Sequence, residues 1–222
     1  AAIHKVLSKF PMRKLLTDFW LHSMATGVCS QLVAQECGFA ITEEAFVAGL
    51  LHDVGKLILA QYMEDEYTLV WRDVLKGAPY LVAERNHLGV DHVGVGLELA
   101  RKWRFDDVLR TVIAAHHDLD AVPTDFDSPL PRIVNFSNEV CALLYREGPG
   151  NRLQTLQGVV AQSSARVGVA PDRFQDVLAS LPERIEELSQ CFGIEIGPLP
   201  EAALREPVRE PVDPPWRWSG RS

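Results

Sequence analysis

Apolar residues recur every three or four positions along most of the chain, which is the period of an α-helix that packs on one side. One such stripe predicts a helix from about Met12 to Cys37, ended by Gly38. The next periodic segment predicts a single helix from Thr42, the expected N-cap, to about Met63. Further helices are expected over residues 65–76, 79–87, 91–103, 106–117, 130–146, 151–166 and 171–191. The pattern therefore predicts an all-α fold.

Two segments lack the helical period. Residues 118–131 hold three prolines among acidic and small polar residues, so a long surface loop without regular structure is expected there. In residues 194–222, six prolines alternate with charged residues, a composition that cannot form a packed core. We therefore expect one helical domain over residues 1–193 and an extended Pro-rich tail or linker over residues 194–222.

Charge and composition exclude several classes of partner. The 222 residues carry 22 Lys and Arg against 30 Asp and Glu, a net charge of −8 without a basic block, so no nucleic-acid partner is expected. No apolar run approaches the roughly 20 residues that cross a bilayer, so no membrane partner is expected either. The four cysteines form no CxxC pair, which predicts reduced, buried thiols and a cytoplasmic protein. Because the sequence does not begin with Met, we expect a processed chain or a piece of a longer protein.

The pair His52-Asp53 stands inside the apolar stretch GLLHDVGKL, where buried polar side chains need a compensating partner. Neutral imidazole and carboxylate together suit a divalent cation such as Fe, Mn, Ni or Zn. A hydrogen-bonded core pair is the competing interpretation, and the pair alone does not exclude it.

Other histidines favour the metal. Five of the seven histidines lie in predicted apolar helices, whereas solvent-facing histidines fall more often on polar faces or in loops. We therefore expect a joint cluster for one or two divalent ions. The expected ligands are His22, His52, Asp53, His92, His116 and His117; His4 and His87 are set aside, although His87 could be confused with His92.

Lys56 follows His52 and Asp53 by about one helical turn and could face the same cavity. There its ammonium group would hold an anionic phosphate as a point charge. A surface lysine that extends its charge into water fits the same spacing.

The order of these residues resembles the HD superfamily of metal-dependent phosphohydrolases. Within it, the stretches AFVAGLLHDVGKLIL, AERNHLGVDHVGVGLELARKW and IAAHH look like the HDOD branch, the HD-related output domain of bacterial signalling proteins, over residues 11–145. The resemblance implies an HD-domain-like helical bundle around a His/Asp metal position. If the chain is active, it also implies catalytic roles for Lys56 and Asp53.

Three departures from the family bear on activity. The last metal ligand of the family is an Asp, and the matching position here is Asn138, which brings no negative charge. No GYP signature follows His116-His117, which disfavours a cyclic di-GMP phosphodiesterase. The helical N-terminal half usual in HDOD proteins would stand before the point where this sequence begins, so we expect either a truncated chain or a branch of the family that lacks this half.

Two functions of different classes follow. The first is an HDOD-type regulatory domain that transmits a signal to a partner domain or protein and keeps most of its metal ligands. The alternative is an active metal-dependent phosphohydrolase that acts on a nucleotide or other phosphate ester. In that case a metal-bound water would attack phosphorus, Asp53 would bridge two ions and Lys56 would offset developing charge. An oxygenase with a similar His/carboxylate site is a third, weaker hypothesis.

Overall fold

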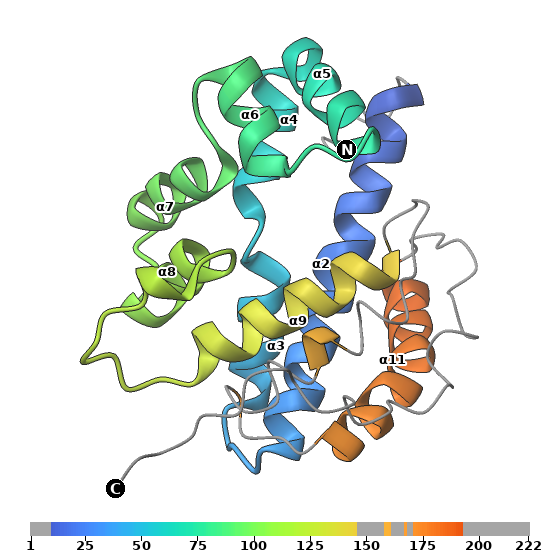
Figure 1. Ribbon diagram of the computed structural model, residues 1–222, viewed down its shortest axis with the longest axis vertical. Helices are drawn as coiled ribbons and strands as arrows, with labels where there is room; N and C mark the ends of the chain where they lie inside the picture. The colour runs from blue at the N-terminus through green and yellow to red at the C-terminus, as the bar shows by residue number, and fades with distance from the viewer. Residues whose placement is uncertain (1–9, 146–157, 161–166, 168–170, 193–222) are drawn as a thin grey trace, which may run out of the picture.

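Helices form all the regular structure in the described part of the chain, residues 10–145, 158–160, 167 and 171–192 of this computed structural model (Figure 1). This confirms the predicted fold class. The main helices are α2 (Phe10–Glu36), α3 (Thr42–Leu51), α4 (Val54–Tyr62), α5 (Glu64–Leu75), α6 (Tyr80–Leu88), α7 (His92–Lys102), α8 (Asp107–Ala115), α9 (Leu130–Tyr145) and α11 (Pro171–Phe192).

The long helix α2 connects two hydrophobic cores. Its 27 residues span about 40 Å. Near its start, Leu15 and Leu16 are buried against α4, α5 and α6. Further along, Ala25, Val28, Cys29, Val33 and Ala34 are buried in the core that includes α3, α9 and α11. Gly38, with φ of +71°, follows the end of the helix, as the sequence predicts. His22 lies between the two buried segments and so at the junction of the cores.

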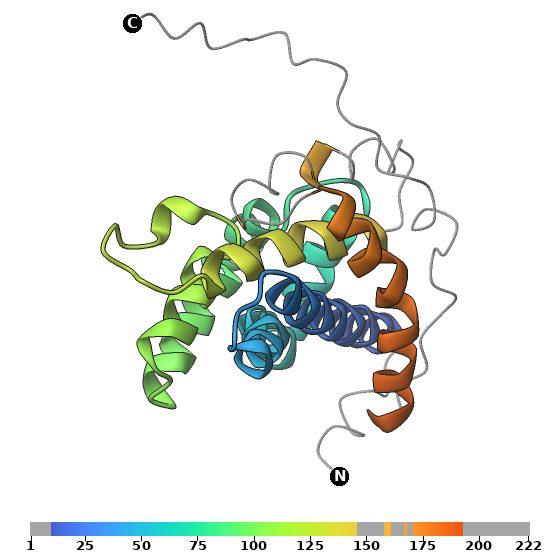
Figure 2. The ribbon, with the colours of Figure 1, turned by 90° about the horizontal axis from the view of Figure 1, so that it is seen from below.

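A third, small core joins α4, α7 and α8 through Val54, Ala100 and Ile113. Figure 2 shows α2 and α3 in the middle, α11 on one side of them and α7 and α8 on the other. The middle of the molecule, where the three cores meet, is therefore bordered by helices that come from distant parts of the sequence.

The predicted helix from Thr42 to Met63 is wrong in one respect, because it is broken at His52 and Asp53 (Figure 1). Asp53 has φ of −101° and ψ of 13°, outside the helical values, and α4 restarts at Val54. The cause is tertiary: α3 packs in the core with α9, while Gly55 at the start of α4 lies against the backbone of α7. The break places both side chains at the junction of the cores.

Smaller differences concern the ends of the segments. Ile41, not Thr42, is the N-cap of α3, and the Thr42 hydroxyl donates to the Glu43 carboxylate instead. The expected loop over residues 118–131 includes one 3-10 turn at Leu119–Ala121. Most of the helix predicted over residues 151–166 and the whole tail over residues 194–222 lie outside the described residues.

The prediction of free thiols is confirmed for all four cysteines, and the prediction that they are buried is confirmed for two of them. All four are free; Cys29 and Cys141 are buried, whereas Cys37 is half-buried and Cys191 is exposed on α11. Among the described residues, none of the helices combines the length and apolar character that crossing a bilayer requires.

Candidate metal centre

The six predicted ligands come together at the junction of the three cores, in two groups that share Asp53. The four-donor group is Asp53, His92, His116 and His117; the three-donor group is His22, His52 and Asp53. Within each group the ligand atoms lie within 4.8 Å of one another. The ligands after α2 lie at helix ends: between α3 and α4, at the first turn of α7 and directly after α8.

The four-donor group has the spacing of a coordination shell. The Oδ1 atom of Asp53 lies 3.2 Å from Nε2 of His92 and 3.3 Å from Nε2 of His116. The His92 Nε2 atom is 3.3 Å from Nε2 of His116 and 3.0 Å from Nε2 of His117. Ligand atoms that each lie about 2.0–2.2 Å from one cation are separated by roughly 3.0–3.5 Å. The four atoms therefore fit around a single divalent ion.

Backbone hydrogen bonds direct the ring nitrogens of two ligands. His52 Nδ1 lies 2.6 Å from the Gly49 carbonyl, and His116 Nδ1 lies 2.8 Å from the Ile113 carbonyl. Because a carbonyl can only accept, each Nδ1 carries the hydrogen and each Nε2 keeps its lone pair for the cluster.

Two buried atoms of the cluster lack hydrogen-bond partners. They are Nε2 of His52 and Oδ1 of Asp53, both on side chains that are no more than 1% exposed. Burying such acceptors without a partner is costly, and a cation beside each atom would satisfy it. The donor set thus fits a divalent metal of the Fe, Mn, Ni or Zn type.

The sequence did not indicate Glu84, which lies outside the ligand groups and holds the ligand His92 in place. This fully buried carboxylate on α6 accepts from the His92 backbone N–H at 2.9 Å, from His92 Nδ1 at 2.6 Å and from the Tyr67 hydroxyl at 3.0 Å. Nothing local marks it, because α6 is rich in polar residues and only the turn from α6 to α7 brings Glu84 to His92.

The three-donor group is arranged around the other oxygen of Asp53. Its Oδ2 atom lies 3.3 Å from Nε2 of His52, 3.6 Å from Nε2 of His22 and 2.5 Å from Nζ of Lys56. The His22 Nε2 atom also lies 3.0 Å from Oδ1 of Asn138. Asn138 in turn donates to the His116 carbonyl at 3.1 Å, which ties α9 to the turn after α8.

Lys56 faces the cluster, which is one of the two positions that its spacing allows, and it has a partner on each side. Besides its ion pair with Asp53, its Nζ atom lies 4.3 Å from the centre of the Tyr80 ring. Its side chain is 11% exposed. The lysine is therefore a neighbour of the predicted ligands rather than an extended surface residue.

Electrostatics keep most of the ligands in the form that binds metal. Burial alone would raise the pKa of Asp53, but the neighbouring His52 and the positive charge of Lys56 outweigh it and hold this pKa well below its ordinary value. Burial is the main cause that lowers the pKa of His22 to about 3 and of His116 to about 4. His117 is exposed on one side, but desolvation on its inner side and then the neighbouring His116 and His92 lower its pKa as well.

His92 behaves differently from the other histidines. Burial and the charge of Lys56 lower its pKa, but the contacts of its ring with the Asp53 and Glu84 carboxylates prevail and the pKa is raised. A metal ion must therefore displace a proton that these two carboxylates favour on His92.

The lowered pKa values predict that the metal-free protein is destabilised by acid. Below about pH 6.5 the unfolded chain binds protons on His22 and His116, whereas the folded chain does not until their lower pKa values are reached. Stability should fall by about 1.4 kcal/mol per pH unit for each of these two groups as the pH drops from 6.5 toward 4. The exposed His117 contributes less because water screens it, and His92 opposes the trend.

Urea midpoints of the chelator-treated protein at pH 7, 5.5 and 4.5 measure this dependence. A midpoint that stays constant over this range would contradict the lowered pKa values.

Replacing Glu84 by Gln should weaken metal binding by about 10-fold to 100-fold, because the carboxylate that orients His92 is lost. Tyr67→Phe is the matched control: it removes one hydrogen bond to Glu84 but leaves the contact with His92, so a smaller loss is expected. Metal titration by calorimetry measures both. Equal affinities in Glu84→Gln and the unchanged protein would contradict a supporting role for Glu84.

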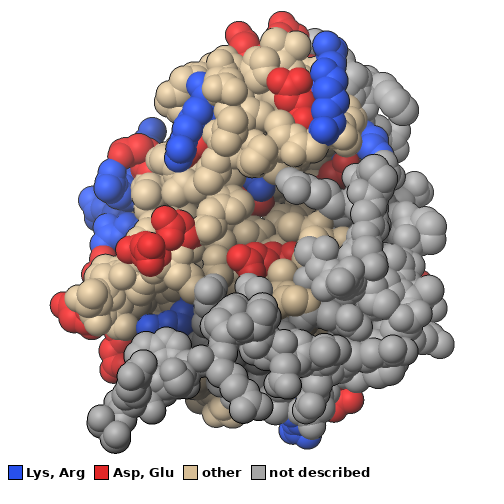
Figure 3. Space-filling model, in the orientation of Figure 1, with Lys and Arg blue, Asp and Glu red and all other residues tan. Residues whose placement is uncertain are grey.

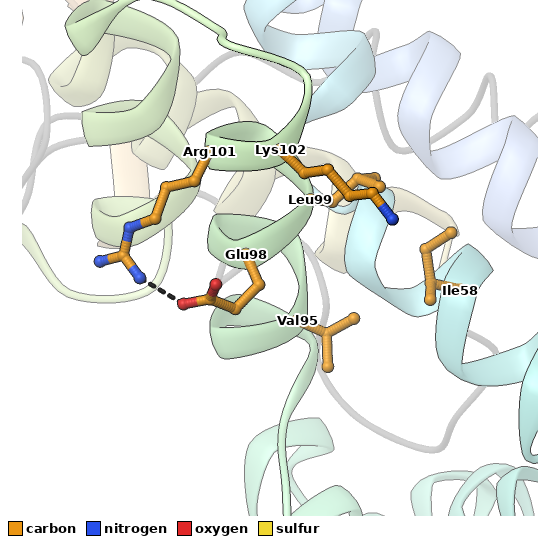
Figure 4. Close-up of a pocket in the computed structure, with 6 residues that line it drawn as sticks. All are labelled: Ile58, Val95, Glu98, Leu99, Arg101 and Lys102. Carbon is orange, nitrogen blue, oxygen red and sulfur yellow. Dashed lines mark hydrogen bonds and ion pairs between the residues drawn. The ribbon is translucent and has the colours of Figure 1, made fainter.

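One ligand of the cluster, His117, is exposed. Figure 3 shows a hollow near the middle of one face, with a basic and an acidic side chain inside it. A separate pocket lies between α4 and α7, lined by Ile58, Val95, Glu98, Leu99, Arg101 and Lys102 (Figure 4). None of the six predicted ligands lines that pocket, so it does not belong to the metal centre.

Comparison with curated proteins finds ribonucleases. The chain is 30% identical over 142 residues to Ribonuclease Y of Aquifex aeolicus, a match that covers 63% of this chain and 19% of the relative. The chain thus spans about a fifth of the length of that relative.

Solved structures share the fold. An HDOD domain protein of unknown function from Geobacter sulfurreducens has a TM-score of 0.66 and 25% identity over 78% of this chain and 62% of its own. A candidate phosphohydrolase from Shewanella amazonensis has a TM-score of 0.55 and 22% identity, covering 78% and 60% of the two chains. A response regulator from Methylococcus capsulatus has a TM-score of 0.54 and 21% identity, covering 73% of this chain and 60% of its own. At these identities the last two show the fold alone.

The family model of the HDOD domain matches residues 1–119, which is more than half of the 222 residues. The helical bundle with its buried His/Asp cluster agrees with this match, as does the Geobacter structure. The chain belongs to the HDOD family, the HD-related group that its sequence motifs resemble.

Proposed function

We propose that this chain is a regulatory domain whose helices are held in one arrangement by a divalent metal ion at the His/Asp cluster. The observation that carries the proposal is the origin of the ligands. They come from α2, the α3–α4 junction, α7 and the end of α8, and these elements belong to three separate cores. Binding at such a junction can control how the cores are placed relative to one another.

Four residues at the centre have distinct roles in this proposal. Asp53 brings the negative charge that attracts the ion, and His92 and His116 anchor α7 and the end of α8 to it. Glu84 holds the His92 ring in place. The ion itself supplies a strong electrostatic bond between these groups, which protein contacts across the junction would not replace. A partner domain that touches α7 or α8 could then sense whether the site is filled.

The comparisons support a signalling context only in outline, through the HDOD family match and the response regulator that shares the fold. The acidic chain favours a protein partner over RNA, because a net charge of −8 opposes contact with phosphates.

The test compares chelator-treated protein with protein loaded with Zn²⁺ or Mn²⁺. Saturation at about 100 times the dissociation constant should raise the melting temperature by roughly 5–10 °C. Hydrogen exchange should slow at the first turn of α7 and the last turn of α8. Unchanged melting and exchange would overturn the proposal. The same samples are screened for hydrolysis of generic phosphoesters and nucleotides, with His52→Ala/Asp53→Ala as the control, and no turnover is expected.

The second candidate function is a metal-dependent phosphohydrolase. The specific observation in its favour is that His117, at one side of the four-donor group, is exposed, so a water or substrate oxygen could reach an ion there. The matched relative is named as a ribonuclease, an enzyme class that cleaves phosphodiesters. In this role Lys56 would have to leave Asp53 to bind a phosphate. Metal-dependent turnover that disappears in the control variant would establish this function instead.

Asn138→Asp should tighten metal binding several-fold, because its Oδ1 atom lies 3.0 Å from Nε2 of His22 and would gain a negative charge at the three-donor group. Calorimetric titration measures the change, and the hydrolysis screen shows whether activity appears with it. An affinity equal to that of the unchanged protein would contradict the placement of Asn138 beside the centre.

A further inference from the structure

We propose that the centre takes a single divalent ion, in the four-donor group, and that the ammonium group of Lys56 occupies the place of a second ion in the three-donor group. This inference rests on the proposed metal site and adds to it the number of ions, their position and the reason. Asp53 would then join one metal ion and one internal cation through its two oxygens.

The four-donor group is the better position for the ion. It combines the carboxylate Oδ1 of Asp53 with three imidazoles whose Nε2 atoms lie 3.0–3.3 Å from a neighbouring ligand atom. Oδ1 is buried and has no partner outside the cluster, where the Nε2 atoms of His92 and His116 lie 3.2 Å and 3.3 Å from it. The exposed side at His117 leaves room for water as a further ligand.

In the three-donor group, Lys56 already contacts the carboxylate oxygen that a metal ion would bind, Oδ2 of Asp53. A divalent ion would lie about 2.0–2.2 Å from Oδ2 of Asp53, and Lys56 Nζ already lies 2.5 Å from that oxygen. The lysine is fixed there because it follows Asp53 by three residues and its Nζ atom lies over the Tyr80 ring. An ion and the ammonium group would compete for the same lone pairs.

Charge balance leads to the same result. Two carboxylates, Asp53 and Glu84, contact the cluster histidines. One ion together with Lys56 exceeds their charge by a single unit, whereas a second ion would add two more in a buried site. Asn138 faces His22 with a neutral amide oxygen, so it offers no compensation. One ion with Lys56 is therefore much closer to charge balance than two ions would be.

The experiment counts bound ions in the full, untagged chain. The protein is stripped with a chelator, equilibrated with Zn²⁺ alone and analysed for bound zinc by elemental analysis. The unchanged protein should hold one equivalent. Lys56→Met keeps most of the side-chain volume but frees Oδ2 of Asp53, so it should hold two. Lys56→Arg is the matched control that keeps the positive charge, and it should hold one. Circular dichroism confirms that each variant is folded.

A second pair of variants locates the ion. His117→Ala should lose the single equivalent or bind it at least 10-fold more weakly, because a four-donor ligand is removed. His22→Ala should retain it. The reverse result would overturn the assigned position, and one equivalent in Lys56→Met would overturn the role of Lys56.

Failure of this inference is distinguishable from failure of the proposed metal site. Two equivalents in the unchanged protein would overturn the single-ion assignment and leave the metal site standing. No bound zinc in the unchanged protein would overturn both.

Discussion

Asp53→Asn is expected to abolish metal binding and to lower the free energy of unfolding of the metal-free protein by about 3 kcal/mol. The carboxylate is 1% exposed and serves both ligand groups, so the amide removes the shared charge from each. It also leaves the ammonium group of Lys56, 11% exposed, without the carboxylate 2.5 Å away. Elemental analysis and urea unfolding after chelation measure the two effects separately.

The control is the double variant Asp53→Asn/Lys56→Met. If the loss of stability comes from an uncompensated lysine, removing that lysine should restore most of it while metal binding stays absent. A double-mutant cycle on these two positions gives the coupling energy. Additive effects of the two substitutions would mean that the ion pair contributes nothing to stability.

Gly55→Ala is expected to be the most disruptive small substitution near the centre. A Cβ atom at Gly55 would lie 1.9 Å from the His92 carbonyl oxygen and 2.8 Å from the Gly96 nitrogen, both rigid backbone atoms. Helices α4 and α7 must separate to admit it, which moves Asp53 and His92 apart. We expect a loss of at least about 3 kcal/mol in unfolding free energy and at least a 10-fold loss of metal affinity.

Gly94→Ala is the matched control for this substitution on the facing helix. A Cβ atom at Gly94 meets only Oδ1 of Asp91, at the ordinary contact distance of 3.5 Å. Because alanine favours helix over glycine, this variant should gain about 0.5–1 kcal/mol. Thermal unfolding of both variants tests the contrast. Similar stabilities for the two would show that α4 and α7 are not in close contact at Gly55.

The periodic pattern was sufficient for the helices that each pack in a single core. The helices predicted over residues 65–76 and 79–87 agree with α5 and α6 to within a residue at each end. The pattern failed at His52 and Asp53, where apolar periodicity runs on without interruption and no Pro stands at the break. That break arises because Gly55 lies against the backbone of α7 at His92, and these two residues are far apart in sequence.

For the site, residue types predicted more than spacing did. The histidines in apolar segments and the HD motif indicated which side chains meet, because buried imidazoles and carboxylates need a shared partner. What they could not indicate is the division into two groups around the oxygens of Asp53. Nor could they reveal Glu84, which lies in a polar helix and reaches His92 only through the turn between α6 and α7.

The position of α2 has a consequence for synthesis on the ribosome. Asn138 emerges 116 residues after its partner His22, and α9 must be present before the cores can close. At about 5–20 residues per second, this interval lasts roughly 5–20 s. During that time the apolar side of α2 lacks the helices that will cover it, so the nascent chain is exposed to aggregation and to chaperones until the last part of the centre has been made.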